Sequence, residues 1–287
     1  MIPSGFEYHR PTDIASALNL LQTHGDEARV IAGGHSLIPM MKLRMADLDH
    51  LIDLQGIAEL RGIEIGDGTI ALGAMVTQSE LIDSDALANA APILREAALQ
   101  IADPQVRYVG TIGGNVANGD PGNDMPGLMQ CLNARFELQG PNGTRQVAAR
   151  DFYEAAYFTA RSDEEILTRI VIPVPAAGTG YAYEKQKRKI GDYATAAAAV
   201  LVGLEGGQIT EAAVAMTNLS DTPVYSAAAG AALVGTSGDD AARATAVAAA
   251  LGDIDPSEDM RGPVEFKKHV AGVIIRRAID RAIERAA

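Results

Sequence analysis

The sequence predicts an α+β protein made of a parallel α/β segment, an antiparallel segment and a C-terminal unit of strands and helices. The first 55 residues alternate strand, helix and strand, an order that favours a small parallel sheet. After residue 61 apolar residues alternate with polar ones around a tight turn, which is typical of a hairpin. A proline-rich stretch at 173–178 then resembles a linker. The predicted segments are 1–56, 57–177 and 178–287.

The N-terminal segment contains a helix that Thr12 can cap and Gly25 can end, because glycine adopts the left-handed conformation at a helix C-terminus. Its apolar positions are Ile14, Ala17, Leu18 and Leu21. We expect strands at 28–31 and 51–54, with a short helix at 37–43 between them.

The middle segment begins with the hairpin around Asp67-Gly68, followed by a capping box in which Thr77 and Glu80 satisfy each other's amides. Residues 102–126 have no apolar period and are dense in Gly, Asn, Asp and Pro, so we expect a long functional loop. The other expected elements are helices from 77 to 87, 92 to 100 and 124 to 132, and strands at 135–138, 145–148 and 166–172.

Three strands and three helices are expected in the C-terminal unit, because alternating apolar runs give way to helical periodicity. The strands are expected at 181–187, 196–204 and 211–216, and the helices at 225–234, 240–251 and 263–286.

Composition excludes several classes of protein. The net charge of −13 and pI of about 4.8 disfavour binding to a nucleic-acid backbone. No signal peptide is visible, and no run approaches the ~18 apolar residues of a membrane span. We therefore expect a soluble cytoplasmic chain without direct membrane insertion.

Metal and nucleophile chemistry is not expected in this chain. Cys131 is the single cysteine, lies on an apolar helix stripe and cannot alone hold an iron–sulfur cluster. No G-x-S-x-G motif is present. The five histidines lack metal-ligand spacing, so we interpret them as separate surface or packing residues.

Two glycine pairs are the main candidate binding motifs. Glycine reaches positive φ and lets backbone amides approach a ligand, and successive amides form a concave nest for an anion. Each pair alone is a weak signal, but together they suggest one elongated ligand with two phosphates held between subdomains. The first motif is Ala32-Gly33-Gly34-His35-Ser36 and the second is Thr111-Ile112-Gly113-Gly114-Asn115.

Three further features leave two interpretations open. Asp124 either caps a helix or accepts hydrogen bonds from a sugar or an adenine. Lys185, Lys187, Arg188 and Lys189 form either a solvated face or a site for a phosphate or an acidic partner. Tyr193 either packs or stacks on a planar ring.

These motifs resemble those of the FAD-binding medium subunits of molybdenum hydroxylases. The resemblance covers essentially the whole chain and is carried by AGGHSLIPMMK at 32–42, DPQVRYVGTIGGNVANGDPGNDMP at 103–126 and YEKQKRKIGDYATAAAA at 183–199. It implies an FAD-binding fold of the vanillyl-alcohol-oxidase (PCMH) type, whose two subdomains sandwich FAD, followed by a C-terminal three-stranded sheet with helices.

The resemblance also implies roles for site residues. The two glycine motifs would hold the pyrophosphate and nearby ribityl or ribose oxygens, and Asp124 the adenosine end. Leu167 would pack on the adenine side, Lys185 would lie at the flavin, and Tyr193 would lie near the isoalloxazine ring. No catalytic residue and no metal ligand is implied.

The implied activity is electron relay. A large subunit with molybdenum and molybdopterin cytosine dinucleotide would oxidise carbon monoxide, a small subunit with two 2Fe–2S clusters would pass the electrons on, and FAD would deliver them to a quinone. A dimer of heterotrimers is implied, which partners could hold at the inner membrane face. The alternatives are an N-heterocycle, purine or aldehyde hydroxylase, a self-contained flavin oxidoreductase, or an interaction module without cofactor.

Overall fold

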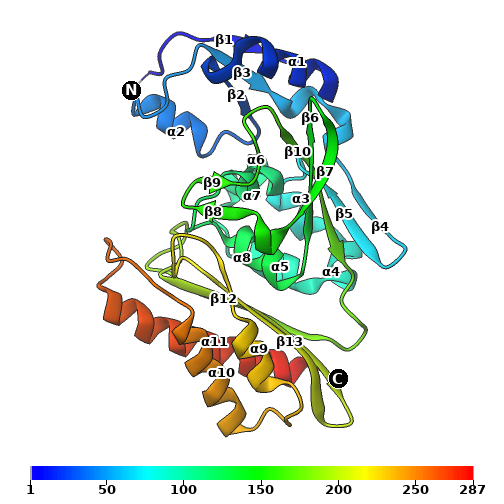
Figure 1. The fold of residues 1–287 in the computed structure, drawn as a ribbon, viewed down its shortest axis with the longest axis vertical. Helices are drawn as coiled ribbons and strands as arrows, with labels where there is room; N and C mark the ends of the chain where they lie inside the picture. The colour runs from blue at the N-terminus through cyan, green and yellow to red at the C-terminus, as the bar shows by residue number, and fades with distance from the viewer. Residues whose placement is uncertain (1, 287) are drawn as a thin grey trace.

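The computed structural model describes residues 2–286 and arranges them around three main sheets along the long axis of the molecule (Figure 1). The first sheet has the order β1-β3-β2 and is parallel throughout, as predicted. Helix α1 ends at Gly25, as predicted, but the residue that caps its start is Asp13 rather than Thr12. The elements are β1 (Glu7–His9), α1 (Ile14–His24), β2 (Ala28–Ile31), α2 (Leu37–Lys42) and β3 (His50–Asp53).

The second sheet is antiparallel and has the order β4-β5-β10-β6-β7. Asp67 and Gly68 both take positive φ in the turn between β4 and β5, which confirms the predicted hairpin. The strands are β4 (Ile63–Gly66), β5 (Thr69–Gly73), β6 (Arg135–Gly140), β7 (Gly143–Ala148) and β10 (Ile166–Pro173), with a small separate pair, β8 (Tyr153–Ala155) and β9 (Phe158–Thr159).

Helices cover this sheet, and the capping box of Thr77 and Glu80 forms as predicted. The helix expected from 77 to 87 is broken, because the Ser84 backbone is extended and its side chain caps a new helix. The helices are α3 (Gln78–Asp83), α4 (Asp85–Ala90), α5 (Pro92–Ala98), α6 (Pro104–Val109), α7 (Ile112–Ala117) and α8 (Asp124–Cys131).

The expectation of one long loop at 102–126 was wrong, because α6 and α7 lie within it. Asp103 caps α6 with Pro104 at its first position, and Thr111 caps α7. Each helix has only six residues, which is too short to show a helical period in the sequence.

The third sheet has the order β11-β12-β13-β14 and is antiparallel, with α9, α10 and α11 beside it (Figure 1). A two-residue strand, β14, joins the three predicted strands. The elements are β11 (Gly180–Gln186), β12 (Ala196–Glu205), β13 (Gln208–Thr217), β14 (Val224–Tyr225), α9 (Ala227–Leu233), α10 (Asp240–Gly252) and α11 (Val264–Arg285).

Strand β12 is buried on both faces, which explains its run of alanines. Ala197 and Ala199 belong to the core of the middle segment, whereas Ala198 and Val200 belong to the core under the C-terminal helices. Side chains alternate between the faces of a strand, so small residues at consecutive positions let two layers approach one sheet. The boundaries predicted after residues 56 and 177 stay a prediction.

No helix within residues 2–286 is both long and apolar enough to cross a membrane.

Candidate functional site

The first glycine motif forms a tight turn directly after β2. Gly34 has φ of +74°, a conformation that glycine adopts without steric cost. A Cβ on Gly33 would lie 2.5 Å from the carbonyl oxygen of Val109 and 2.8 Å from Cα of Gly110. The motif therefore touches the end of α6 through bare backbone, and α6 and α7 lie below the N-terminal sheet in Figure 1.

Backbone amides in this turn have no protein partner. Within residues 2–286, no acceptor receives the amides of Gly33, Gly34, His35 or Ser36. Ser36 stands at the start of α2 without a side-chain capping bond, so its hydroxyl is not used there either. A run of amides left open beside a positive-φ glycine is the concave donor group that binds phosphate oxygens. The turn fits the predicted anion nest.

The second glycine motif is built differently from the prediction. The amide of Ile112 donates to the Val76 carbonyl at 2.8 Å, and that of Gly113 donates to the Ala74 carbonyl at 2.9 Å. Thr111 accepts the other two, with its hydroxyl from Gly114 at 3.0 Å and with its carbonyl from Asn115 at 3.1 Å. The prediction of a second amide nest was therefore wrong, because these amides already hold α7 against the segment after β5.

Glycine has a packing role in the second motif. A Cβ on Gly113 would lie 2.5 Å from both the carbonyl oxygen and Cβ of Ala74, so only glycine allows this approach. On Gly114 a Cβ would lie 3.5 Å from Cβ of Ala32. Neither glycine has positive φ. Gly114 therefore lies next to Ala32 of the first motif, and the prediction that both motifs hold one ligand stays a prediction.

Asp124 is held by two side chains from β11. Its Oδ2 receives Lys185 Nζ at 2.7 Å and its Oδ1 receives the Tyr183 hydroxyl. The side chains of Asp124 and Lys185 are 6% and 1% exposed, so the ion pair is almost fully desolvated. Burial and the nearby Asp124 carboxylate raise the pKa of Tyr183 well above its usual value, which keeps the donor hydroxyl protonated. The cap of α8 is Asn123, so Asp124 stands in the first turn instead.

Asn115 connects the second motif to this ion pair. Its Oδ1 accepts the Met125 amide at 3.2 Å, and its carbonyl accepts the Asn123 side-chain amide at 2.8 Å. The side-chain amide acceptor expected to serve a ligand is thus engaged in fixing the start of α8. We call residues 111–115, Asp124 and Lys185 the closed block, because the backbone amides of 112–115 and the Asp124–Lys185 ion pair all have partners within the protein.

The basic residues do not form one solvated face. Lys185 is buried, and Lys187 Nζ donates to the Gln100 carbonyl at 3.0 Å. Burial and the nearby Lys185 ammonium lower the pKa of Lys187. Arg188 pairs with Asp192 at 2.8 Å, and Lys189 is exposed. β11 ends at Gln186, before most of the predicted basic strand.

Tyr193 lies beside the loop that follows α7. Its hydroxyl donates to Asp120 Oδ2 at 3.0 Å, and a Cβ on Gly122 would lie 2.8 Å from its ring. The guanidinium of Arg261 lies 5.5 Å from the ring centroid. Burial and the Asp120 carboxylate raise the pKa of Tyr193, so the half-exposed ring carries a protonated hydroxyl.

Leu167 is buried in β10 and belongs to the core of the middle segment. Its neighbour Thr168 accepts the Ala74 amide through its carbonyl at 3.0 Å, and Ala74 in turn packs on Gly113. Leu167 therefore lies near the second motif, in the same core as Ile112.

Cys131 is a core thiol, as predicted. It is 2% exposed and lies 3.4 Å from the Ala199 carbonyl, and burial raises its pKa to about 12.

The prediction of separate histidines was wrong, because His9, His24 and His50 gather at one point of the N-terminal sheet. Their elements are distant in the sequence, so no spacing rule could show this.

Three residues contact the predicted site residues without having been predicted themselves, namely Val109, Gly110 and Asp120. Gly110 begins no glycine pair, and Asp120 looks like an ordinary turn residue. The signal available for Val109 was its apolar side chain in a polar stretch, which indicates order but not a partner.

Family models match nearly the whole chain. Residues 4–175 match the FAD binding domain in molybdopterin dehydrogenase, and residues 181–282 match the CO dehydrogenase flavoprotein C-terminal domain. The chain belongs to the FAD-binding subunits of the molybdopterin dehydrogenase family.

Three comparisons place it within that family. The chain is 57% identical to the carbon monoxide dehydrogenase medium chain of Afipia carboxidovorans, covering 100% of this chain and 99% of that one. It is 44% identical to the corresponding chain of Hydrogenophaga pseudoflava, covering 100% of both. A solved structure of reconstituted CO dehydrogenase from Oligotropha carboxidovorans contains a chain with TM-score 0.98 and 57% identity, covering 100% of both.

Proposed function

We propose that this chain is the FAD-carrying electron-transfer subunit of an aerobic, molybdenum-containing carbon monoxide dehydrogenase. The supporting observation is full-length identity of 57% and 44% to two medium chains of such enzymes. Carbon monoxide and water would be converted to carbon dioxide on another subunit, with electrons reaching this chain afterwards. This chain would not contact the substrate, so its own residues do not identify it. Those identities favour carbon monoxide over an N-heterocycle, a purine or an aldehyde.

The open amides of residues 33–36 are the observation that carries the cofactor role. The pyrophosphate of FAD needs several donors within a small concave surface, which these four amides and the Ser36 hydroxyl would supply. Ala32 and His35 flank the same turn. Bound FAD would exchange electrons singly with one partner and in pairs with another.

The closed block would act by positioning. Thr111, Ile112, Gly113, Gly114 and Asn115 would form the second wall of the cofactor cleft through side chains and α7 packing rather than through free amides. Asp124 would fix Lys185 at the flavin side of that wall, since its carboxylate already receives the ammonium. Leu167 would support the adenine side from β10.

Tyr193 would stand near the flavin ring and restrict access by the electron acceptor. Support for this comes from its half-exposed ring, held in place by Asp120 and Arg261 at the edge of the loop after α7. Raised pKa keeps its hydroxyl as a donor to Asp120 at neutral pH, so the ring is fixed without a negative charge.

The proposed partners are a small subunit with two 2Fe–2S clusters and a large subunit with molybdenum and molybdopterin cytosine dinucleotide, as a dimer of heterotrimers. The clusters are assigned to the small subunit in this scheme, because a set of thiolate ligands needs more cysteines than the single one in this chain. We further propose a quinone acceptor and a cytoplasmic complex held at the inner membrane face by partners.

An absorption spectrum of the natively purified complex, with its subunits resolved on a gel, tests this function. Flavin and iron–sulfur bands with two co-purifying chains, bleached by carbon monoxide, are the expected result. A complex with the same bands that bleaches only with a purine, an aldehyde or an N-heterocycle would overturn the substrate. A lone yellow chain that turns over a small molecule unaided would overturn the relay role.

A further inference from the structure

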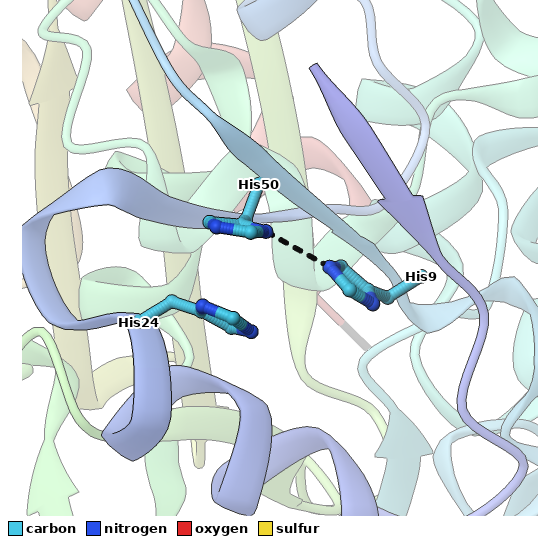
Figure 2. A group of neighbouring side chains, drawn as sticks. All are labelled: His9, His24 and His50. Carbon is cyan, nitrogen blue, oxygen red and sulfur yellow. Dashed lines mark hydrogen bonds between the residues drawn. The ribbon is translucent and has the colours of Figure 1, made fainter.

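Three histidines from three elements converge at the N-terminal sheet (Figure 2). His9 is the last residue of β1, His24 the last of α1 and His50 the first of β3. Each is partly buried, and none of the three is among the residues proposed to hold FAD.

The strand register brings two of these side chains to one face. His9 pairs with Ile52, and His50 lies two residues before Ile52 on the same strand. Paired residues and residues two apart share a face, so both imidazoles point to the side on which Ile52 packs against α1. The end of α1 then supplies His24 from above that face.

Distances among the rings suit a shared ion. His9 Nε2 lies 3.1 Å from His50 Nδ1, and one ring nitrogen from each of the three histidines falls within 4.8 Å of the other two. Zinc–nitrogen bonds of about 2.0–2.1 Å in a tetrahedral site place ligand nitrogens about 3.4 Å apart. The ring of His24 stacks on that of His50 at 3.6 Å between centroids, so His24 has to turn about its side-chain torsions for its lone pair to point at an ion shared with the other two rings.

The surroundings favour a cation. Glu7 pairs with His50 in the sheet register and places Oε2 3.5 Å from His50 Nδ1. Asp26 and Glu27 follow His24 after Gly25, in the exposed turn at the end of α1. Three imidazoles with one nearby carboxylate form a nitrogen-rich set, which selects zinc and similar transition metals over calcium or magnesium.

We infer that His9, His24 and His50 form a binding site for a divalent transition-metal ion of the zinc class, with the fourth position available to Glu7 or water. The site is structural. It ties the three-residue edge strand β1 to β3 and α1, whereas the glycine turn follows the carboxyl end of β2, on the other side of β3 from β1.

Zinc uptake by the intact complex tests this inference. The complex is treated with a chelator, dialysed, exposed to Zn²⁺ and washed, and zinc per flavin is measured by mass spectrometry. About one zinc per copy of this chain is expected in the wild type. His24→Gln should bind zinc at least tenfold more weakly, because one of three protein ligands is lost. His269→Gln, on α11 and outside the cluster, is the matched control and should keep the wild-type stoichiometry.

Cobalt substitution gives a readout that needs no variant. Co²⁺ added to the chelated wild-type complex should produce the visible d–d absorption of a tetrahedral nitrogen-rich site, and equimolar Zn²⁺ should remove it. Flavin content serves as the folding check for His24→Gln. If the His24→Gln complex does not assemble, His9→Gln is used in its place. Equal zinc uptake by wild type, His24→Gln and His9→Gln, or the absence of a cobalt band in the wild type, would overturn the site.

Discussion

The two glycine motifs share a sequence pattern and differ in what their amides do. In residues 33–36 the amides are open, and Gly34 alone takes positive φ. In residues 112–115 every amide has a protein acceptor, and the glycines serve close packing. A Gly-Gly pair thus has two separate uses. It can expose backbone donors to a ligand, or it can allow close packing where a Cβ would clash. Only the tertiary partners of the segment decide between them.

The largest effect on stability is expected when a charge is removed from the closed block. Lys185→Met leaves the buried Asp124 carboxylate without its cation, and breaking such a pair costs about 3–5 kcal/mol. Urea unfolding of the purified chain measures the loss. The double variant Asp124→Asn/Lys185→Met removes both charges and should recover much of it. A single-variant loss below about 1 kcal/mol would mean that the block is not closed by this pair.

The role of glycine in close packing is tested at Gly113. The Cβ of Gly113→Ala would meet the backbone of Ala74, which cannot move aside, so overpacking should lower the free energy of unfolding by about 1–3 kcal/mol. Gly252→Ala, at the end of α10 with nothing within 4 Å, is the control and should leave stability within about 0.5 kcal/mol. Equal stability of the two variants would remove the packing role.

Donor exposure is tested at Gly34. The new Cβ of Gly34→Ala meets chiefly the end of the flexible Ile38 side chain, so the main cost is left-handed backbone, about 1–2 kcal/mol. We expect FAD affinity to fall roughly 5–30-fold as the turn relaxes. Gly68→Ala carries the same positive φ in the β4–β5 hairpin and should keep normal flavin content. Loss of flavin from both variants would show general strain instead.

The smallest effect is expected from the hydroxyl groups of Ser36 and Thr111, which stand at the N-cap positions of α2 and α7. Ser36→Ala should weaken FAD binding by about 0.5–1.5 kcal/mol without changing stability, since its hydroxyl makes no capping bond. Thr111→Ala should cost about 1 kcal/mol of stability, because its hydroxyl caps α7. Flavin fluorescence titration and urea unfolding of both variants measure the two effects. The opposite pattern would reverse the assignment of the motifs.

Local signals predicted local structure well. The hairpin at Asp67-Gly68, the capping box of Thr77 and Glu80 and the end of α1 at Gly25 depend on neighbouring residues, and all were confirmed. The class of ligand followed from motifs that the family models also match.

Contacts between residues far apart in the chain could not be predicted from the sequence. The amides of 112 and 113 are taken by residues almost 40 positions earlier, and a glycine pattern carries no record of that pairing. β1 has three residues, too few for a periodic signal. His9, His24 and His50 meet only because of sheet register and the end of a helix, so their separations in the chain are uninformative.

Strand β12 has a consequence for dissecting the protein. Residues 174–179 contain no regular secondary structure and look like a place to cut. Yet the core of the middle segment includes Tyr183, Ala197 and Ala215 from beyond that stretch. A truncation there would remove part of the core of the middle segment. It would also leave the C-terminal half with an exposed apolar sheet face. The two halves are therefore best expressed, mutated and transplanted as a single piece.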